Sequence, residues 1–301
     1  MKKQMTKYAA ILIALTATVS CNLDLFPDST INTEESMETL DDCSKWRNGC
    51  YASMKYVTTG GFVYATELQT DLFHAVKNFG NFDGEFYHYH VTPSSEMPNV
   101  VWYGLYGNLA NINVFIAGAE KFMNDTSLPE NDRKTAAIYY GEGCFMRAFL
   151  HFSLTQYFCK DYDPDTAEKT LGVPVVTKWN PVTDRKNFQP RNTLQETYYQ
   201  ICKDIEQAER NLADQYMPNV SDRKYLNIDV LKAFKARVAL TMEDYETAYT
   251  AAEELISNNR YSLVKDKKEF AEGWIHDNLS ETIWQVQMKD ATDLGNSFKY
   301  F

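Results

Sequence analysis

Apolar residues recur at intervals of three and four along most of this chain, a spacing typical of helices that bury one face. The pattern is clearest after Thr193, which is predicted to form a capping box with Glu196 because each side chain can accept a bond from the other's backbone N–H. The apolar stripe that follows consists of Leu194, Ile201, Ile205, Ala208 and Leu212. We therefore predict an amphipathic helix from Thr193 onward.

Three further segments share this spacing and are predicted to be helices: Met37 to about Tyr56, Val100 to Met123, and Asp132 to about Cys159. The third segment places Phe145, Phe149 and Phe152 on one face, so we expect it to be largely buried. Arg147 lies within this apolar helix, and an ion pair with Glu142 or another acid is favoured over a ligand contact.

A helical hairpin is predicted from Ile228 to Ile256, with its turn at Asp244 and Tyr245. Its second helix carries Ala248 and Ala252, small residues that allow paired helices to approach closely. The hairpin resembles a single tetratricopeptide repeat. The predicted fold class is therefore all-α, a tetratricopeptide-like helical-repeat body with long loops and a few short strands.

The expected loops and strands lie between these helices. Asn78 to Asn99 is rich in aromatic residues, glycine and proline and is predicted to be a long loop. Val173, Val175 and Val176 indicate a short extended segment, and the alternation from Glu281 to Met288 predicts a strand.

The first residues have the order of an export signal: three lysines, an apolar run from Tyr8 to Val19, then Ser20 and Cys21. The run is shorter than the roughly 20 residues that a membrane-spanning helix needs. A cysteine at this point is typical of a bacterial lipoprotein, so we predict a signal peptide over residues 1–20, acyl chains such as palmitate on Cys21, and a polar tether over residues 21–36. Ordinary secretion with a free Cys21 is the alternative.

The charge of the chain narrows its partners. Removal of residues 1–20 takes away three lysines and no acid, so the formal net charge changes from −11 to −14. Such acidity repels phosphate backbones, which argues against nucleic acid and leaves neutral sugars or peptides open.

Motifs for catalysis or metal binding are weak. We find no nucleophile elbow, phosphate loop, zinc-protease motif or dinucleotide fingerprint, and predict no cofactor. His88 and His90 are too few to hold a metal ion. Asp161, Asp163 and Asp165 begin like a calcium loop, but the glycine and glutamate required later are missing, so a solvated turn is favoured.

The cysteines after Cys21 form an odd set without zinc-type spacing: Cys43, Cys50, Cys144, Cys159 and Cys202. Seven helical residues separate the first two by about 10.5 Å, too far for a disulfide. We expect buried thiols.

Three stretches, in order along the chain, carry a resemblance to a known family. The first is Asn48, Gly49 and Tyr51. The second is Trp102, Tyr106, Leu109 and Asn113. The third is Gly141, Glu142, Phe145, Arg147, Ala148 and Phe152, followed by Gly172, Val173 and Pro174. Together they resemble the SusD/RagB family of outer-membrane nutrient-binding lipoproteins.

The resemblance implies a SusD-like α-helical domain over residues 37–301, from which the C-terminal part of the family fold is expected to be missing. It further implies a non-catalytic, lipid-anchored protein at the surface of the outer membrane, which captures oligosaccharide, or peptide, for a TonB-dependent transporter. Two alternatives stay open: a helical-repeat scaffold that binds only protein, and an all-α glycoside hydrolase whose carboxylates need no local spacing.

Sugar binding requires flat aromatic faces with nearby amide or carboxylate groups. The expected aromatic loop offers both, and Trp179 lies in a second, proline-flanked loop. The predicted ligand-binding residues are Phe79, Asn81, Phe82, Asp83, Tyr87, Tyr89 and Trp179. Core packing is about as probable for any one of the aromatic residues.

Overall fold

The structure is a computed structural model that describes residues 36–76, 83–182, 184–213 and 223–286. The chain divides into two units, residues 1–38 and 39–301, and the fold described here belongs to the second. The predicted signal peptide, the lipidated Cys21 and nearly all of the tether lie outside the described residues. Among the residues it describes, no helix has both the length and the apolar character needed to cross a bilayer.

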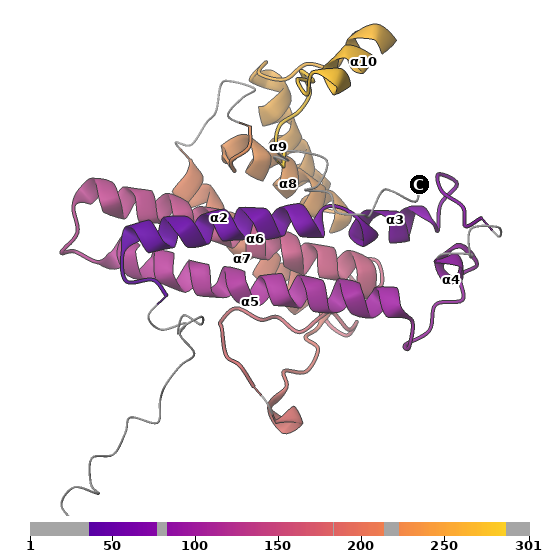
Figure 1. The fold of residues 1–301 in the computed structure, drawn as a ribbon, viewed down its shortest axis with the longest axis horizontal. Coiled ribbons are helices and arrows are strands. Elements are labelled where there is room, and N and C mark those ends of the chain that lie inside the picture. The colour runs from indigo at the N-terminus through magenta and orange to yellow at the C-terminus, as the bar shows by residue number, and fades with distance from the viewer. Residues whose placement is uncertain (1–35, 77–82, 183, 214–222, 287–301) are drawn as a thin grey trace, which may run out of the picture. The chain divides into compact units, whose positions relative to one another are not determined.

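The described part of the second unit is built from helices, which confirms the all-α prediction (Figure 1). Their bounds are α2 Leu40–Val57, α3 Gly61–Glu67, α4 Gly84–Tyr87, α5 Glu96–Asn124, α6 Glu130–Phe158, the 3-10 turn η2 Arg185–Asn187, α7 Leu194–Leu212, α8 Ile228–Thr241, α9 Tyr245–Ser257 and α10 Lys267–Ile275. Helix α6 packs against both α5 and α7, α2 covers α5, and α8 pairs with α9.

Capping boxes begin two of these helices. At α7 the Glu196 backbone N–H donates to Thr193 Oγ1 over 3.1 Å, and the Thr193 N–H donates to Glu196 Oε2 over 2.9 Å. Thr39 and Asp42 form the same arrangement at α2. Because each box satisfies N–H groups that a helix start leaves unpaired, both starts are local properties of the sequence.

The aromatic face of α6 joins the bundle to the hairpin. Rings of Phe145, Phe149 and Phe152 surround Phe234 of α8, with centroids 5.2, 5.8 and 5.5 Å from it. On the same helix, Gly143 faces α5 so closely that an added Cβ would lie 2.6 Å from Ile116 Cγ1. The small residue is therefore required for α5 and α6 to meet.

Helices α8 and α9 form the predicted hairpin, which turns at Glu243 in the left-handed region, with φ of 62°. The buried alanines of α9 are Ala248 and Ala251, whereas the predicted Ala252 is half-buried.

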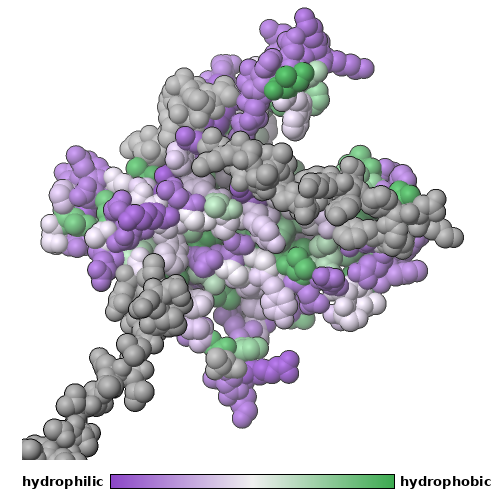
Figure 2. Space-filling model, in the orientation of Figure 1, coloured by the Kyte–Doolittle hydropathy of each residue, from purple (hydrophilic) through white to green (hydrophobic). Residues whose placement is uncertain are grey.

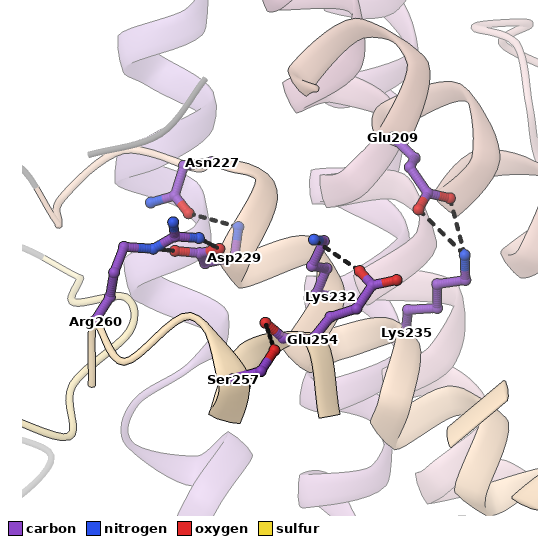
Figure 3. A network of polar contacts seen from close by, with 8 residues as sticks. All are labelled: Glu209, Asn227, Asp229, Lys232, Lys235, Glu254, Ser257 and Arg260. Carbon is purple, nitrogen blue, oxygen red and sulfur yellow. Dashed lines mark hydrogen bonds and ion pairs between the residues drawn. The ribbon is translucent and has the colours of Figure 1, made fainter. Parts of the chain in front are cut away.

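Ion pairs cross the hairpin and tie it to its neighbours (Figure 3). Lys232 Nζ of α8 lies 2.7 Å from Glu254 Oε2 of α9, and Lys235 pairs with Glu209 of α7 at 2.9 Å. At the start of α8 the buried Asp229 binds the Arg260 guanidinium, so the segment after α9 is held against α8.

One predicted boundary was wrong, and two short helices that precede it in the chain were not predicted. Helix α5 begins at Glu96 rather than Val100, because Pro98 falls in the first turn, where a helix does not need its missing N–H. The stretch predicted as loop contains α4. Helix α3 was not predicted at all.

The predicted strand from Glu281 is not a strand over residues 281–286, and Met288 lies outside the described residues. The segment is instead held by Trp284, whose Nε1–H donates to the Lys224 carbonyl and whose ring meets Phe145, and by the Gln285 N–H, which donates to the Arg223 carbonyl. Leu171, at the beginning of the extended segment, forms one isolated antiparallel bridge with Thr193.

Cysteine burial follows the prediction in part. Cys43, Cys50 and Cys144 are buried, whereas Cys159 and Cys202 are half-buried, and all five thiols are free.

Candidate ligand-binding site

A small apolar cluster holds α4 in place near the N-terminal end of α5 (Figure 1). Phe86 of α4 is buried against Tyr64, Ala65 and Leu68, which come from α3 and the residue that follows it. Phe73 and Met97 pack around this cluster. One ring of the aromatic segment is therefore a core residue, and it anchors the others.

Backbone and side-chain bonds fix the turn on either side of α4. Asp83 and Tyr89 have φ of 51° and 55°, so the chain enters and leaves α4 through left-handed residues. Ser95 Oγ donates to Glu85 Oε2 over 2.8 Å, and the His90 N–H donates to the Glu85 carbonyl over 2.8 Å. The segment is thus an ordered turn rather than an open loop.

The exposed side chains around this turn form what we call the aromatic platform: His74, Tyr87, His88, Tyr89 and His90. The Tyr87 ring centroid lies 6.3 Å from His74 and 5.0 Å from His88, and His88 lies 6.2 Å from His90. Tyr89 is 69% exposed and its hydroxyl donates to the Gln69 carbonyl. These flat rings face solvent, where a sugar ring can stack on them.

Asp83 was predicted as a ligand residue, but it turns partly inward. It is half-buried and hydrogen-bonds Tyr64 of the supporting cluster. Burial raises the pKa of Asp83, the bond from Tyr64 opposes that shift, and the Glu85 and Glu96 carboxylates add to it. Through this bond Asp83 links the platform to its supporting cluster.

Trp179 is exposed, as predicted, with 47% of its surface accessible. It lies in the loop between α6 and α7, and Figure 1 shows most of this loop away from α4. The platform and Trp179 are therefore two separate candidate contacts. Phe79, Asn81 and Phe82 lie outside the described residues.

The polypeptide just before Trp179 is fastened by side chains of α5. Tyr106 Oη donates to the Pro174 carbonyl over 2.8 Å, and Asn113 Nδ2 donates to the Val176 carbonyl over 3.0 Å. At the beginning of the segment, Gly172 lies against the start of α7, where an added Cβ would lie 2.6 Å from the Thr193 carbonyl oxygen.

Helix α6 adds two more contacts to the same segment. Arg147 Nη1 donates to the Thr177 carbonyl over 3.1 Å, and the Val176 N–H donates to His151 Nε2 over 3.3 Å. His151 is fully buried. Burial lowers the pKa of His151 to about 4, with Asp204 opposing and Arg147 reinforcing the shift.

The predicted ion pair of Arg147 exists, but its partner is Asp204 of α7. The guanidinium binds both Asp204 oxygens, at 2.8 and 2.6 Å, and both side chains are buried. Glu142 binds Arg47 of α2 instead. The reason is helix geometry, because residues five apart on one helix point to different faces.

The Arg47–Glu142 pair belongs to a separate buried network. Tyr51 Oη donates to Glu142 Oε1 over 2.8 Å and accepts a bond from the Leu226 N–H over 2.9 Å. The Arg47 guanidinium also lies 4.3 Å from the ring centroid of Tyr225. Burial raises the pKa of Glu142, and the Arg47 cation opposes that shift. This network joins α2, α6 and the start of the hairpin.

Metal binding finds no support within the described ranges, which contain no group of three His, Cys, Asp or Glu side chains placed to hold an ion. Asp163 accepts bonds from the Asp165 N–H and the Thr166 hydroxyl, each 2.9 Å long. Asp163 therefore caps a turn that contains Asp165, and all three aspartates lie at this turn rather than in a calcium loop.

A polar hollow at α10 was not predicted. Its volume is about 250 Å³, and its lining includes Glu269, Glu272, His276, Asn278 and Ser280. Helix α10 also carries the largely exposed side chains of Trp274 and Ile275, and Figure 2 shows hydrophobic surface at this end of the molecule.

Sequence reasoning identified Tyr87, Tyr89 and the exposure of Trp179, but it missed His74 as a member of the platform. His74 lies thirteen residues before Tyr87 and in no motif, so no sequence signal was available. The histidines at 88 and 90 were recognised only as weak metal ligands, whereas their rings extend the aromatic surface.

The described part of the chain is therefore a helical bundle with a paired-helix unit and a group of exposed aromatic rings. A family model described as "Starch-binding associating with outer membrane", SusD-like, matches residues 22–240. The chain belongs to this SusD-like family, as the resemblance indicated. The family's members are carbohydrate-binding proteins.

Individual relatives agree with this assignment. SusD-like protein P38 from Formosa agariphila is 26% identical over 272 residues, which cover 90% of this chain and 49% of that protein. A SusD superfamily protein from Bacteroides thetaiotaomicron has 25% identity and a TM-score of 0.63, with 82% of this chain and 52% of that chain covered. The chain spans about half the length of these relatives.

Structures with lower identity share the fold. A laminarin-binding SusD-like protein is 18% identical with a TM-score of 0.61, covering 81% of this chain and 50% of its own. NanU of B. fragilis is 21% identical with a TM-score of 0.63, covering 88% of this chain and 51% of its own.

Proposed function

We propose that this chain is a non-catalytic cell-surface lipoprotein that binds oligosaccharide and delivers it to a TonB-dependent outer-membrane transporter. The observation that carries the binding proposal is the aromatic platform, which gathers exposed tyrosine and imidazole rings whose neighbouring centroids lie 5.0 to 6.3 Å apart. Trp179 offers a second stacking face. Peptide is the alternative ligand, because the same faces accept apolar side chains.

The location follows from the first residues. In this proposal residues 1–20 are removed, Cys21 carries the lipid, residues 21–36 form the tether and residues 37–301 form the SusD-like domain. Mass spectrometry of the membrane fraction would show acyl chains on Cys21, and Cys21→Ala would release the protein into the soluble fraction. A Cys21→Ala protein that stays in the membrane would contradict the anchor.

Ligand binding is tested by isothermal titration of residues 22–301 with laminarin oligosaccharides, maltoheptaose and short peptides. We expect saturable heat with a glycan and none with peptides, and no reducing ends released on incubation. Loss of the heat in Tyr87→Ala would assign the site to the platform. Loss only in Glu272→Gln would move it to the polar hollow at α10, and release of reducing ends would favour a glycoside hydrolase.

Delivery is tested by co-purification with a transporter from membranes. A transporter that co-purifies with a chain that binds no glycan would favour the scaffold alternative.

A further inference from the structure

The segment from Val173 to Thr177 has no regular ladder of its own, yet most of its backbone polar groups are bonded. Three of its carbonyls, at Pro174, Val176 and Thr177, accept bonds from side chains of α5 and α6. We call the four contributing side chains the bundle clamp: Tyr106, Asn113, Arg147 and His151.

The clamp is itself rigid. Asn113, Arg147 and His151 are buried, and the Arg147 guanidinium is held in the plane of the Asp204 carboxylate by two bonds. Arg147 also donates to Asn113 Oδ1 over 3.2 Å, which orients the amide that reaches Val176. Buried polar groups are costly to leave unpaired. Any other placement of the segment would therefore leave several donors of the clamp without an acceptor.

The loop secures the other side of the same segment. Gln189 Nε2 donates to the Val175 carbonyl over 2.7 Å, and the Val175 N–H donates to Asn192 Oδ1 over 2.9 Å. Every residue from Pro174 to Thr177 therefore has a backbone group held by a side chain. Trp179 follows Thr177 by two residues, a reach of about 7 Å at most.

We propose that the bundle clamp positions Trp179 for ligand contact, so that Tyr106, Asn113 and Arg147 are positioning residues for glycan binding although they do not face the ligand. This inference rests on the proposed function. It assigns to buried residues of α5 and α6 a part in affinity, through the placement of an exposed ring.

The test uses Tyr106→Phe, which removes one clamp donor and leaves the ring in the bundle. Tyr261→Phe is the matched control, because its half-buried hydroxyl donates to Asp229 over 2.9 Å, far from the loop in sequence. Asp229 is charged, so a purely structural effect would be at least as large in the control.

Two readouts separate positioning from stability. Affinity for laminarin oligosaccharides and maltoheptaose is measured by titration. The environment of Trp179 is followed by fluorine NMR of 5-fluorotryptophan protein, with its resonance assigned by loss in Trp179→Phe. The Trp102 resonance is set aside, because its ring contacts Tyr106 at 4.7 Å between centroids.

We expect Tyr106→Phe to weaken binding about two- to tenfold, the range of one hydrogen bond, and to shift or broaden the Trp179 resonance. Tyr261→Phe should leave affinity within about twofold and the resonance in place. Equal weakening by both variants, or an unmoved Trp179 resonance in Tyr106→Phe, would overturn the inference.

Two outcomes distinguish this inference from the proposed function. Unchanged affinity in Trp179→Ala, with a wild type that binds glycan, would overturn the inference and leave the proposed function standing. A wild type that binds no glycan would overturn the proposed function and the ligand role of Trp179, while the resonance comparison would still decide whether the clamp sets the position of that ring.

Discussion

The two candidate contact regions are held in place by different parts of the molecule. The aromatic platform depends on neighbours in the chain, since its supporting cluster comes from Tyr64 to Met97. The Trp179 segment depends largely on the core helices, since its bonds to α5 and α6 join positions 25 to 68 residues apart, beside loop bonds over 14 and 17 residues. The difference teaches that one exposed ring can be stabilised locally while another is an extension of the core. Each can therefore be perturbed without the other.

The largest effect is expected from Asp204→Ala, which leaves the buried Arg147 guanidinium without its partner. Removal of one member of a buried ion pair costs about 3–5 kcal/mol of the free energy of unfolding. Glu209→Ala, on the same helix, removes a half-exposed pair with Lys235 and should cost no more than about 1 kcal/mol. Urea denaturation of both variants measures the difference. Equal losses in the free energy of unfolding would show that the Arg147–Asp204 ion pair does not anchor the segment before Trp179.

The next effect is a pH dependence due to His151. Its pKa of about 4 in the folded chain lies below the roughly 6.5 of an unfolded histidine. The unfolded chain therefore binds the extra proton between these values, and stability falls as pH decreases through this window. The contribution of neutral His151 to the free energy of unfolding is fully present above about pH 6.5. About 3 kcal/mol of it is lost by pH 4.

Denaturation of the wild type and of His151→Gln at several pH values isolates the contribution of His151 to the pH dependence of stability. Glutamine can still accept the Val176 N–H but does not titrate, so its stability should fall less between pH 6.5 and pH 4. Parallel curves for the two proteins would contradict the prediction.

A smaller effect is expected from Phe86→Ala. The loss should be below the roughly 3–5 kcal/mol typical of a main-core phenylalanine, because the small cluster around it can collapse. We expect hydrogen exchange to accelerate in α3 and α4 while α6 and α7 keep their protection. Loss of protection throughout the bundle would show that the platform is not a separate unit.

The smallest effect on stability belongs to Tyr87→Ala, an exposed substitution expected to change unfolding by less than about 0.5 kcal/mol. Its effect on glycan affinity should be about tenfold, as for a contact residue whose side chain is removed. Tyr103→Ala is the matched control, since Tyr103 is an exposed tyrosine of α5 outside the platform. Equal affinities for the two variants would remove Tyr87 from the site.

Helices were predictable where their signals lie within a few residues. The Thr193 box and the aromatic face of α6 could be recognised because capping and helical spacing act over three or four positions. The strand predicted from Glu281 was wrong over the described residues, where contacts with Arg223, Lys224 and Phe145, far away in sequence, hold the segment instead.

Part of the candidate site was also predictable, for the same physical reason. Exposed tyrosines in a segment rich in glycine indicate a surface turn, and Trp179 between prolines indicates an exposed loop. The ring of His74 beside Tyr87, and the choice of Asp204 rather than Glu142 by Arg147, were not predictable. Both depend on which helices pack together.

The sequence alone determined the helical class, the caps, the hairpin and the family, because these follow from short-range spacing and from motifs in fixed order. Only the tertiary structure decided which buried acid neutralises which arginine, which aromatic ring becomes core and which becomes surface, and how the Trp179 segment is fastened. Those outcomes are set by the close packing of residues distant in the chain, where a buried charge or donor must find its partner.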